Sequence, residues 1–350
     1  MELNSNSAEI LDDLISLYRF RLPKSYTHNG YIWPGLLFSK ERLNSLKDFT
    51  FRSSDILIAS YPKTGTTWIS EIVSLIVHGG DLKAIEDRPL HMRVPWLELD
   101  QKSTVLWIYT WWSELMRSFG LESMAMQPDV KDAIDLTSNE TEAVADDADI
   151  PRVIFTHLPL EMLPEQVANG GCRVIYIARN PKDTAVSFFH FHQMARYLGQ
   201  QKTSWDEFFT LFTTGKVYSG SWFDHVLSFW QLSKTNDRLL FVKYEDMQKD
   251  LRKQVEIVSN FLKVSTTVER MDTIVGHCSF QEMKQNKMTN REGIWLFNHK
   301  VSQFMRKGTV GDWKNYFSVA QNEIFDNLYK EKMIESDSGF AIDFELDQQE

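Results

Sequence analysis

The octapeptide YPKTGTTW at positions 61–68 constrains this chain more than any other stretch. It follows the apolar run Ile56–Ala59, which is typical of a buried strand, and it opens a second run with helical character. A strand that turns sharply at Gly65 into a helix presents backbone N–H groups, a lysine ammonium group and hydroxyls to one oxyanion. The segment therefore predicts a phosphate-binding loop.

The order of residues in this loop narrows the choice of ligand. A Walker A loop carries its lysine after the last glycine, whereas Lys63 precedes Gly65 here. The octapeptide resembles the 5′-phosphosulfate loop of the cytosolic sulfotransferases, which transfer a sulfuryl group from 3′-phosphoadenosine-5′-phosphosulfate (PAPS). Without further segments, an ordinary strand-to-helix turn is the alternative. The resemblance implies that the donor is bound by Lys63, Thr64, Gly65, Thr66, Thr67 and Trp68.

A second segment of this kind begins with the apolar run at 173–178 and continues as RNPKDTAVS at 179–187. The pattern predicts a buried strand, a proline-marked turn and a new helix. The resemblance places Arg179 and Ser187 on the 3′-phosphate of the nucleotide, and a guanidinium suits a phosphate because it donates two hydrogen bonds at once. Alternatively, Arg179 pairs with Asp183 and Ser187 caps a turn.

The segment FMRKG at 304–308 resembles the C-terminal loop of the family. Two adjacent cations and a glycine suit a loop that wraps around a dianion. Taken alone, an Arg-Lys pair is usually solvated surface. The resemblance implies donor binding by Phe304, Met305, Arg306, Lys307 and Gly308.

Two further segments resemble the nucleotide site. The strand pattern at 239–244 ends at Tyr244, which is assigned to the nucleotide, although an aromatic residue at a strand end is an equally simple interpretation. The turn at 277–284 resembles the adenine-binding turn, with Cys278 in place of the usual threonine or serine. A thiol is a poor hydrogen-bond donor, so we expect adenine affinity to be modestly affected. A small buried residue is the preferred alternative for this cysteine, ahead of a redox role. The adenine is assigned to Trp68, Cys278, Phe280 and Met283.

The segment VIFTHLP at 153–159 predicts a short strand that ends at a histidine and is stopped by a proline. A histidine after a strand is more often structural than catalytic, but the resemblance makes His157 the catalytic base. Many relatives carry a lysine two residues earlier, where this chain has Phe155. We expect this departure to alter acceptor handling or charge stabilisation rather than to abolish the chemistry.

The resemblance implies an in-line mechanism. His157 takes the proton from an acceptor hydroxyl as the oxygen attacks sulfur, and Lys63 meets the charge that develops on the leaving phosphate oxygen. Ser187 restrains Lys63 until the acceptor arrives. No metal is implied, because a sulfuryl group carries less charge than a phosphoryl group and the sequence shows no metal-ligand cluster.

The acceptor pocket is expected to be apolar and to bind a flat or lipophilic alcohol or amine. Phenols, steroids, flavonoids, amines and specialised metabolites all stay open as acceptors. Phe188 is at least as well explained as a core residue. The residues expected around His157 are Trp96, Phe155, Phe188, Phe191 and Met305.

Residues 101–149 form an insertion relative to the animal phenol-sulfating branch of the family. Its apolar, aromatic part at 105–116 suggests a helix over the acceptor pocket, and its acidic part at 137–149 suggests a mobile loop. The insertion is therefore either a substrate lid or a surface elaboration. Eight acids and one base between 129 and 149 account for −7 of the formal charge of −10. The cations of the cleft can thus dominate their own surroundings.

Length and composition fit one α/β domain over 1–350, although length alone would allow two. We expect a central, mainly parallel sheet flanked by helices, with a phosphate loop of the nucleotide-kinase kind. The two cysteines, Cys172 and Cys278, fit a reducing compartment. The first residues lack a secretory signal, and no apolar run approaches the ~20 residues that cross a bilayer. We therefore expect a cytoplasmic protein with no membrane or nucleic-acid partner.

The segment at 314–323 resembles the dimerisation pattern K-x-x-x-T-V-x-x-x-E of the family, with serine for threonine. A patch of this kind can be self-complementary across a twofold axis. It implies a homodimer through Lys314, Ser318, Val319 and Glu323.

Two other functions stay open from the sequence. A nucleotide kinase is disfavoured because the loop lacks Walker A order and because the cations at 179 and 306–307 suit a 3′-phosphate rather than a γ-phosphate with Mg²⁺. A catalytically silent protein that binds PAPS or its product, 3′-phosphoadenosine-5′-phosphate (PAP), is the second. The presence of both Lys63 and His157 argues against it.

Overall fold

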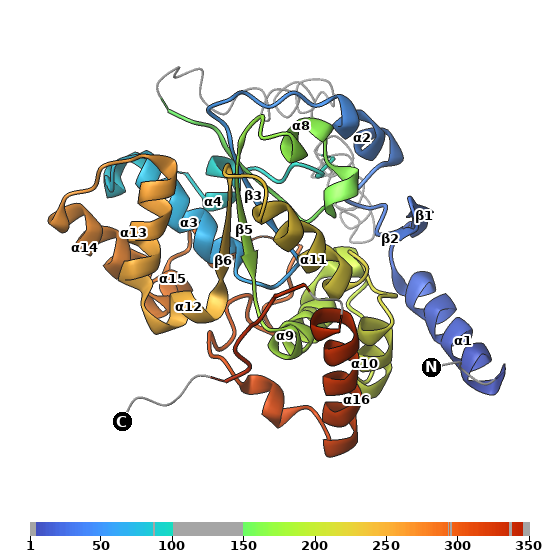
Figure 1. The fold of residues 1–350 in the computed structure, drawn as a ribbon. Helices are drawn as coiled ribbons and strands as arrows, with labels where there is room; N and C mark the ends of the chain where they lie inside the picture. Colours follow the sequence, from blue (N-terminus) through green and yellow to red (C-terminus); the bar gives the residue numbers. More distant parts are fainter. Residues whose placement is uncertain are drawn as a thin grey trace, which may run out of the picture.

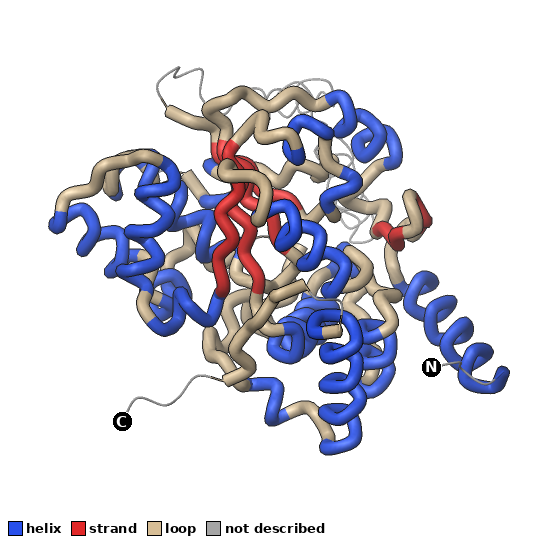
Figure 2. Tube along the Cα trace, in the orientation of Figure 1, coloured by secondary structure: helices blue, strands red, loops and turns tan. Residues whose placement is uncertain are grey.

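The computed structural model describes residues 5–86, 88–100, 150–292, 294, 296–335 and 338–345. The insertion at 101–149, with its predicted helix and acidic loop, lies outside the described residues. At the centre is a parallel sheet with the strand order β4-β3-β5-β6, and helices cover both of its faces (Figure 1 and Figure 2). The predicted α/β fold class is confirmed.

The four strands coincide with the apolar runs of the sequence. Three of them, at 56–60, 153–156 and 173–178, are almost wholly buried, as expected of a parallel sheet that is covered on both faces. The fourth, at 239–243, is only partly buried. The last strand ends one residue before the predicted boundary, because Tyr244 opens a helix instead. The strands are β3 (Ile56–Ser60), β4 (Val153–Thr156), β5 (Arg173–Ala178) and β6 (Leu239–Lys243).

Alternation along the strands creates two separate cores. Leu57 and Ala59 face one core, and Ile56 and Ile58 face the other, because successive side chains of a strand point to opposite faces. The first core is covered by α9 (Pro181–Met194), α10 (Trp205–Thr213), α11 (Trp222–Ser233) and α16 (Val319–Tyr329). The second is covered by α3 (Thr66–Val77), α13 (Leu251–Leu262) and α14 (Val268–His277).

The remaining elements lie around this three-layer centre. Strands β1 and β2 form a small antiparallel pair next to the N-terminal helix. Within the described part of the chain, no helix is both long enough and apolar enough to cross a membrane. These elements are α1 (Ser5–Arg21), β1 (Tyr26–His28), β2 (Tyr31–Trp33), α2 (Lys40–Ser45), α4 (Leu90–Arg93), α8 (Glu165–Ala168), α12 (Tyr244–Lys249), α15 (Phe280–Gln285) and a π-helical turn at Lys330–Ile334.

The strand order places the loops that matter at one edge of the sheet. In register, Ala59 of β3 is paired with Thr156 of β4 on one side and with Tyr176 of β5 on the other. The chain passes from β3 to β4 on one side and then to β5 on the other, so the loops after these strands diverge. Such a switch point leaves a crevice at the carboxyl ends of the strands.

Candidate active site

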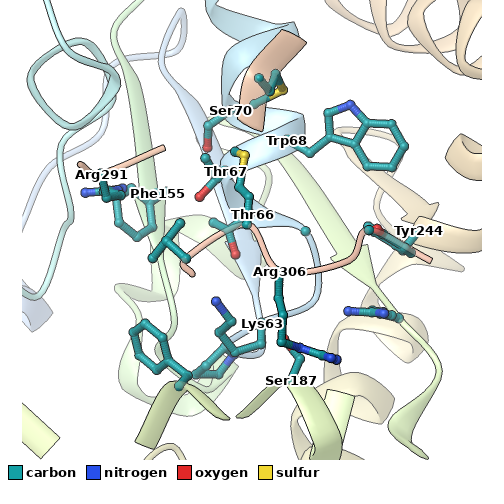
Figure 3. Close-up of a pocket in the computed structure, with 18 of the residues that line it drawn as sticks. Lys63, Thr66, Thr67, Trp68, Ser70, Phe155, Ser187, Tyr244, Arg291 and Arg306 are labelled. Carbon is teal, nitrogen blue, oxygen red and sulfur yellow. The ribbon is translucent and has the colours of Figure 1, made fainter. Parts of the chain in front are cut away.

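A cavity occupies this crevice and brings together segments that are far apart in the sequence (Figure 3). All but three of the residues predicted for the site line it; the exceptions are Thr64, Cys278 and Phe188. The predicted residues that line the cavity are Lys63, Gly65, Thr66, Thr67, Trp68, Trp96, Phe155, His157, Arg179, Ser187, Phe191, Tyr244, Phe280, Met283, Phe304, Met305, Arg306, Lys307 and Gly308.

The phosphate loop depends on Gly65, which precedes the first residue of α3. Its φ of 108° lies in the left-handed region, and a Cβ atom there would come within 2.9 Å of Ile177 Cδ1 and of Tyr244 Cδ2. Only glycine fits this position without strain. The loop therefore turns directly into the N-terminus of α3, where free backbone N–H groups favour an anion.

Thr64 holds the phosphate loop to the sheet. Its hydroxyl donates to the carbonyl oxygens of Tyr61, at 2.7 Å, and Ile177, at 3.1 Å, and its side chain is fully buried. The hydroxyl thus faces the protein and not the cavity. Thr66 does line the cavity, and its Oγ1 lies 2.7 Å from Ser60 Oγ.

Lys63 projects its ammonium group into the cavity. The Nζ atom lies 4.4 Å from the ring centroid of Phe191 and 4.4 Å from that of Phe304. Burial, followed by the nearby charges of Arg179, Arg291 and Arg306, lowers the pKa of Lys63 to about 7. An anion bound beside it would offset these effects and raise its pKa.

His157 follows β4 and presents one ring nitrogen to the cavity. Its Nδ1 lies 2.8 Å from the carbonyl oxygen of Ser60, which can only accept a hydrogen bond. Nδ1 therefore carries the proton, and Nε2 keeps a free lone pair. Burial lowers the pKa of His157 to about 3, and the positive charges of Lys63 and Arg291 act in the same direction.

The backbone of His157 is held on both sides. Its N–H donates to Glu98 Oε1 at 2.7 Å, and its carbonyl oxygen accepts from His225 Nε2 at 3.2 Å. The same carboxylate accepts from the Thr156 hydroxyl at 2.8 Å. Burial raises the pKa of Glu98 to about 7 despite these hydrogen bonds. Because both backbone groups are fixed, the imidazole ring has a defined position beside the cavity.

The guanidinium group of Arg179 has protein partners for some of its hydrogen-bond donors but not for all of them. Its Nη2 donates to the Thr309 carbonyl at 2.9 Å and lies 3.7 Å from Asp183, while the guanidinium carbon lies 4.5 Å from the ring centroid of Tyr244. Asp183 accepts its shorter hydrogen bonds from Asn180 and from the backbone N–H groups of 311 and 313. The Nε atom of Arg179 is buried without a partner. An orphaned donor in the cavity fits an anionic ligand.

The loop at 306–308 is held by one carboxylate. Arg306 Nη2 and Lys307 Nζ each lie 2.5 Å from Asp312. Burial alone would raise the pKa of Asp312, but the hydrogen bonds from these two cations and from Asn315 bring it to about 2. Gly308 has a φ of 69°, and a Cβ atom on it would come within 2.2 Å of Phe280. The glycine therefore lets the backbone lie against the Phe280 ring.

The predicted adenine end is built from rings. Trp68 donates from Nε1 to the carbonyl oxygen of Cys278 at 2.7 Å, and its ring lies edge-on to Tyr244 at 5.2 Å. Phe280 and Met283 line the cavity nearby. The thiol of Cys278 is fully buried in the second core, and burial raises its pKa well above the usual value. Its carbonyl oxygen, rather than its thiol, is therefore linked to the site, through the hydrogen bond from Trp68.

The opposite end of the cavity is aromatic. Trp96 stacks on Phe155 with ring centroids 5.4 Å apart, and both rings meet His157 edge-on. Phe188 lies instead in the first core, fully buried against Tyr61, so the structure favours its interpretation as a core residue. Ser187, one residue earlier on α9, does line the cavity beside Lys63.

Several lining residues were not predicted from the sequence. Most of them come from segments outside the recognised motifs, and the fold brings them to the cavity. Arg291 is the charged residue among them, and a single arginine between an asparagine and a glutamate reads as surface. The additional lining residues are Pro62, Ser70, Leu90, Val94, Tyr197, Tyr218, Arg291, Phe297 and Thr309.

Comparison with known proteins decides the family. The model of the sulfotransferase domain matches residues 53–337. This chain belongs to the sulfotransferase family. It is 38% identical to sulfotransferase 1A1 of the dog over 302 residues, which are 86% of this chain and 90% of that protein. It is also 37% identical to rat sulfotransferase 1C2 over 292 residues, or 83% of this chain and 86% of that protein. Sulfuryl transfer from PAPS to small-molecule acceptors is therefore its activity.

Solved structures agree with this membership. A mouse sulfotransferase in complex with PAP is 32% identical and superimposes with a TM-score of 0.63 over 91% of this chain and 98% of that one. Retinol dehydratase, at 24% identity, has a TM-score of 0.75 and covers 97% of both chains, which shows the shared fold. Within the described ranges of this sulfotransferase, no group of three or more His, Cys, Asp or Glu side chains is placed to hold a metal ion.

Proposed function

We propose that this sulfotransferase transfers the sulfuryl group of PAPS to a hydroxyl or amine of an aromatic or lipophilic small molecule, with His157 as the base. One observation carries the proposal: the unprotonated Nε2 of His157 and the ammonium group of Lys63 share a cavity with cationic loops at one end and aromatic rings at the other. The donor and the acceptor would thus meet between two ends of different character.

The donor is assigned to the polar end of the cavity. The loop at 65–68 and Lys63 suit the 5′-phosphate and its sulfuryl group, because the N-terminus of α3 and an ammonium group converge there. Arg179, Ser187 and the loop at 306–308 suit the 3′-phosphate, and the unpartnered Nε of Arg179 supports this role. Trp68 and Phe280 suit the adenine ring. Thr64 and Cys278 contribute through the backbone they support.

His157 is assigned the proton transfer. Its Nε2 accepts the proton of the acceptor while the acceptor oxygen forms its bond to sulfur, and the bond from sulfur to the bridging phosphate oxygen breaks. The imidazole is neutral at physiological pH, so the lone pair is available. The positive charges of Lys63 and Arg291 oppose formation of an imidazolium ion. A bound anionic donor offsets that repulsion, so the base becomes stronger once the donor is in place.

Lys63 is assigned the leaving group. Its ammonium group lies over the Phe191 and Phe304 rings, which hold it within the cavity. Negative charge that develops on the phosphate oxygen would be met by this cation without reorganisation of solvent. Ser187 is assigned the role of restraining Lys63 before the acceptor arrives, and the fact that both line the same pocket supports this. Trp96, Phe155 and Phe191 would enclose the acceptor.

The homodimer and the cytoplasmic location remain proposals. All four residues of the dimerisation pattern are exposed, and the Val319 side chain has 79% of its surface accessible. Ser318 caps α16 by accepting from the Gln321 N–H, so it fixes the start of the helix that carries the patch. Light scattering after size exclusion tests the dimer. A monomer only, at micromolar concentration, would refute it.

The experiment that tests the function is sulfuryl transfer from labelled PAPS to a panel of phenols, steroids, flavonoids and amines, followed by mass spectrometry. A sulfated product with at least one acceptor is expected. Thermal unfolding is measured in parallel, because PAP without metal should raise the melting temperature and ATP with Mg²⁺ should not. PAP binding without any product would favour the silent binder, and stabilisation by ATP with Mg²⁺ alone would favour a kinase.

A further inference from the structure

Arg291 occupies a position that the donor site does not explain. It follows α15 in the loop that leads to 304–308, with a φ of 62°, which is uncommon for a residue other than glycine. Its carbonyl oxygen accepts from the Ile294 N–H at 3.2 Å and from His299 Nε2 at 3.1 Å. The backbone is thereby held in this conformation, and the side chain lines the cavity.

The guanidinium group has no acidic partner. In the part of the chain that the structure describes, no carboxylate lies within ion-pair distance of Arg291, and its Nε is buried without a hydrogen bond. The guanidinium group lies over the ring of Phe304, whose centroid is 5.6 Å from the guanidinium carbon. Burial lowers its pKa to about 10, so the group still carries its charge at neutral pH. The side chain is only partly exposed, and a charge shielded from water in this way is costly unless something neutralises it.

The other arginines of the cavity differ in this respect. Arg306 is paired with Asp312 at 2.5 Å, and Arg179 is braced by Asp183 and the Thr309 carbonyl. Arg291 is drawn on the side of Phe155, whereas Tyr244 lies on the opposite side with the nucleotide loops (Figure 3). The charge therefore sits at the aromatic end of the cavity, near His157.

We propose that Arg291 selects acceptors that carry an anionic group, such as a carboxylate, in addition to the hydroxyl or amine that is sulfated. The inference rests on the proposed function, because it names the acceptor class of the same site. Aromatic walls would bind the body of such an acid, and the guanidinium fork would pair with its carboxylate through two hydrogen bonds. The hydroxyl at the other end of the molecule would face His157.

The test compares para-hydroxyphenylpropanoate with its methyl ester, which keeps the ring and the hydroxyl but not the charge. Binding to the PAP-loaded protein is measured by calorimetry for wild type, Arg291→Gln and Arg291→Lys. Wild type should bind the acid at least about tenfold more tightly than the ester, since hydrogen bonds to charged groups are the stronger ones. Arg291→Gln should abolish this preference, and Arg291→Lys should keep part of it.

A matched control removes one positive charge from the same loop outside the cavity. Lys300 is exposed, and Lys300→Gln should leave the preference for the acid unchanged. Equal binding of acid and ester by wild type would overturn the proposal. So would an Arg291→Gln variant that weakens both ligands equally, or one that loses PAP affinity tenfold, because the arginine would then serve the donor.

The binding readout separates this proposal from the assignment of the reaction. The acid and the ester are also compared without PAP, so the preference is measured even if the donor site were wrong. A preference for the acid that depends on Arg291, together with no sulfated product from either compound, would support the anion site and contradict the proposed transfer. Sulfation of the ester and the acid at equal kcat/KM would support the proposed transfer and contradict the anion site.

Discussion

The two ends of the cavity are constructed differently. At the end proposed to bind the donor, called the donor end below, buried carboxylates hold the cations: Asp312 holds Arg306 and Lys307, and Asp183 holds the loop at 311–313. At the acceptor end, rings such as Trp96 and Phe155 touch one another, and polar groups are few. A network of charges and backbone hydrogen bonds has one correct geometry, whereas a ring-lined wall accepts many shapes. The donor end is therefore built for one ligand.

This difference has a consequence for specificity. Apolar walls discriminate weakly between molecules of similar size, while an unpaired polar group rejects whatever cannot satisfy it. At the acceptor end, the polar groups include the indole N–H of Trp96, His157, Arg291 and the hydroxyls of Tyr197 and Tyr218. Tyr218 is buried without a hydrogen-bond partner for its hydroxyl. Selection among acceptors should thus depend on these groups rather than on the rings.

The largest effect is expected from His157→Ala, which removes the proposed base but leaves the donor end intact. Transfer should fall about 10²- to 10⁴-fold, which is the usual contribution of a positioned acid or base. PAP affinity should be unchanged, because the donor loops do not depend on the imidazole. Initial rates with labelled PAPS and calorimetry with PAP measure the two quantities.

The matched control for this variant is His78→Ala, which removes a histidine at the end of α3 that does not line the cavity. It should keep wild-type rates. If the His157→Ala enzyme kept a near-normal rate, another group would have to accept the proton, and the assignment of the base to His157 would be wrong.

The second largest effect is expected from Gly308→Ala, which should weaken nucleotide binding at the donor end. The added Cβ would lie 2.2 Å from Phe280, and the ring can only move by giving up its place beside the cavity. Overpacking of this kind costs about 1–3 kcal/mol, so PAP should bind roughly ten- to a hundredfold more weakly. Calorimetric titration with PAP measures the loss.

Gly276→Ala is the control, because nothing lies within 4 Å of a Cβ atom at this position of α14. Alanine should stabilise the helix by about 1 kcal/mol or less and leave PAP affinity unchanged. An unchanged PAP affinity in Gly308→Ala would show that the Phe280 ring does not contact the nucleotide.

A smaller, pH-dependent effect is expected at Lys63, which lies between the two ends. Its pKa is about 7 in the free protein, and a bound anion should raise it. Above pH 7, binding of PAP must therefore take up a proton, and affinity should fall with rising pH by up to about tenfold per unit. The loss starts near the free pKa and stops near the higher, bound one.

The proton uptake is measured by calorimetry at pH 8 in buffers with different ionisation heats. The nucleotide phosphates also titrate, so the difference between wild type and Lys63→Met is the informative quantity. The variant should bind more weakly at low pH and show a flatter profile. Identical profiles would mean that Lys63 is not beside the bound phosphates.

The sequence-based predictions for the two ends of the cavity failed in different ways, for a physical reason. Contiguous loops such as 61–68 fix their own geometry through residues like Gly65, so a short motif carries most of the information. A motif does not show which way each side chain points. The Thr64 hydroxyl bonds to two carbonyl oxygens and faces the protein, which the spacing did not reveal.

At the aromatic end, Trp96, Phe155 and Phe191 line the cavity as predicted, but Arg291 and Tyr197 were missed because they come from separate segments of the chain. Arg291 enters the cavity only because its backbone adopts a positive φ that a contact with His299 maintains. No local pattern encodes that conformation. Phe188 and Phe191 show the same limit, since both lie on α9 and only one of them reaches the cavity.

The smallest effect is expected from Cys278→Ser, which tests whether the side chain at this position contacts the nucleotide. The thiol is fully buried in the second core, and the Cys278 carbonyl already accepts from Trp68. A serine there should leave PAP affinity unchanged within about twofold while lowering the melting temperature, because a buried hydroxyl without a partner costs about 1–3 kcal/mol. Calorimetry with PAP and thermal unfolding measure the two effects.

Cys172→Ser is the matched control, since Cys172 is equally buried but belongs to the first core. Its stability should fall similarly, and it has no route to the nucleotide. A severalfold gain in PAP affinity for Cys278→Ser alone would mean that a hydroxyl at this position reaches the adenine. In that case the side chain, and not only the backbone, would belong to the donor end, and the natural cysteine would be a departure that weakens it.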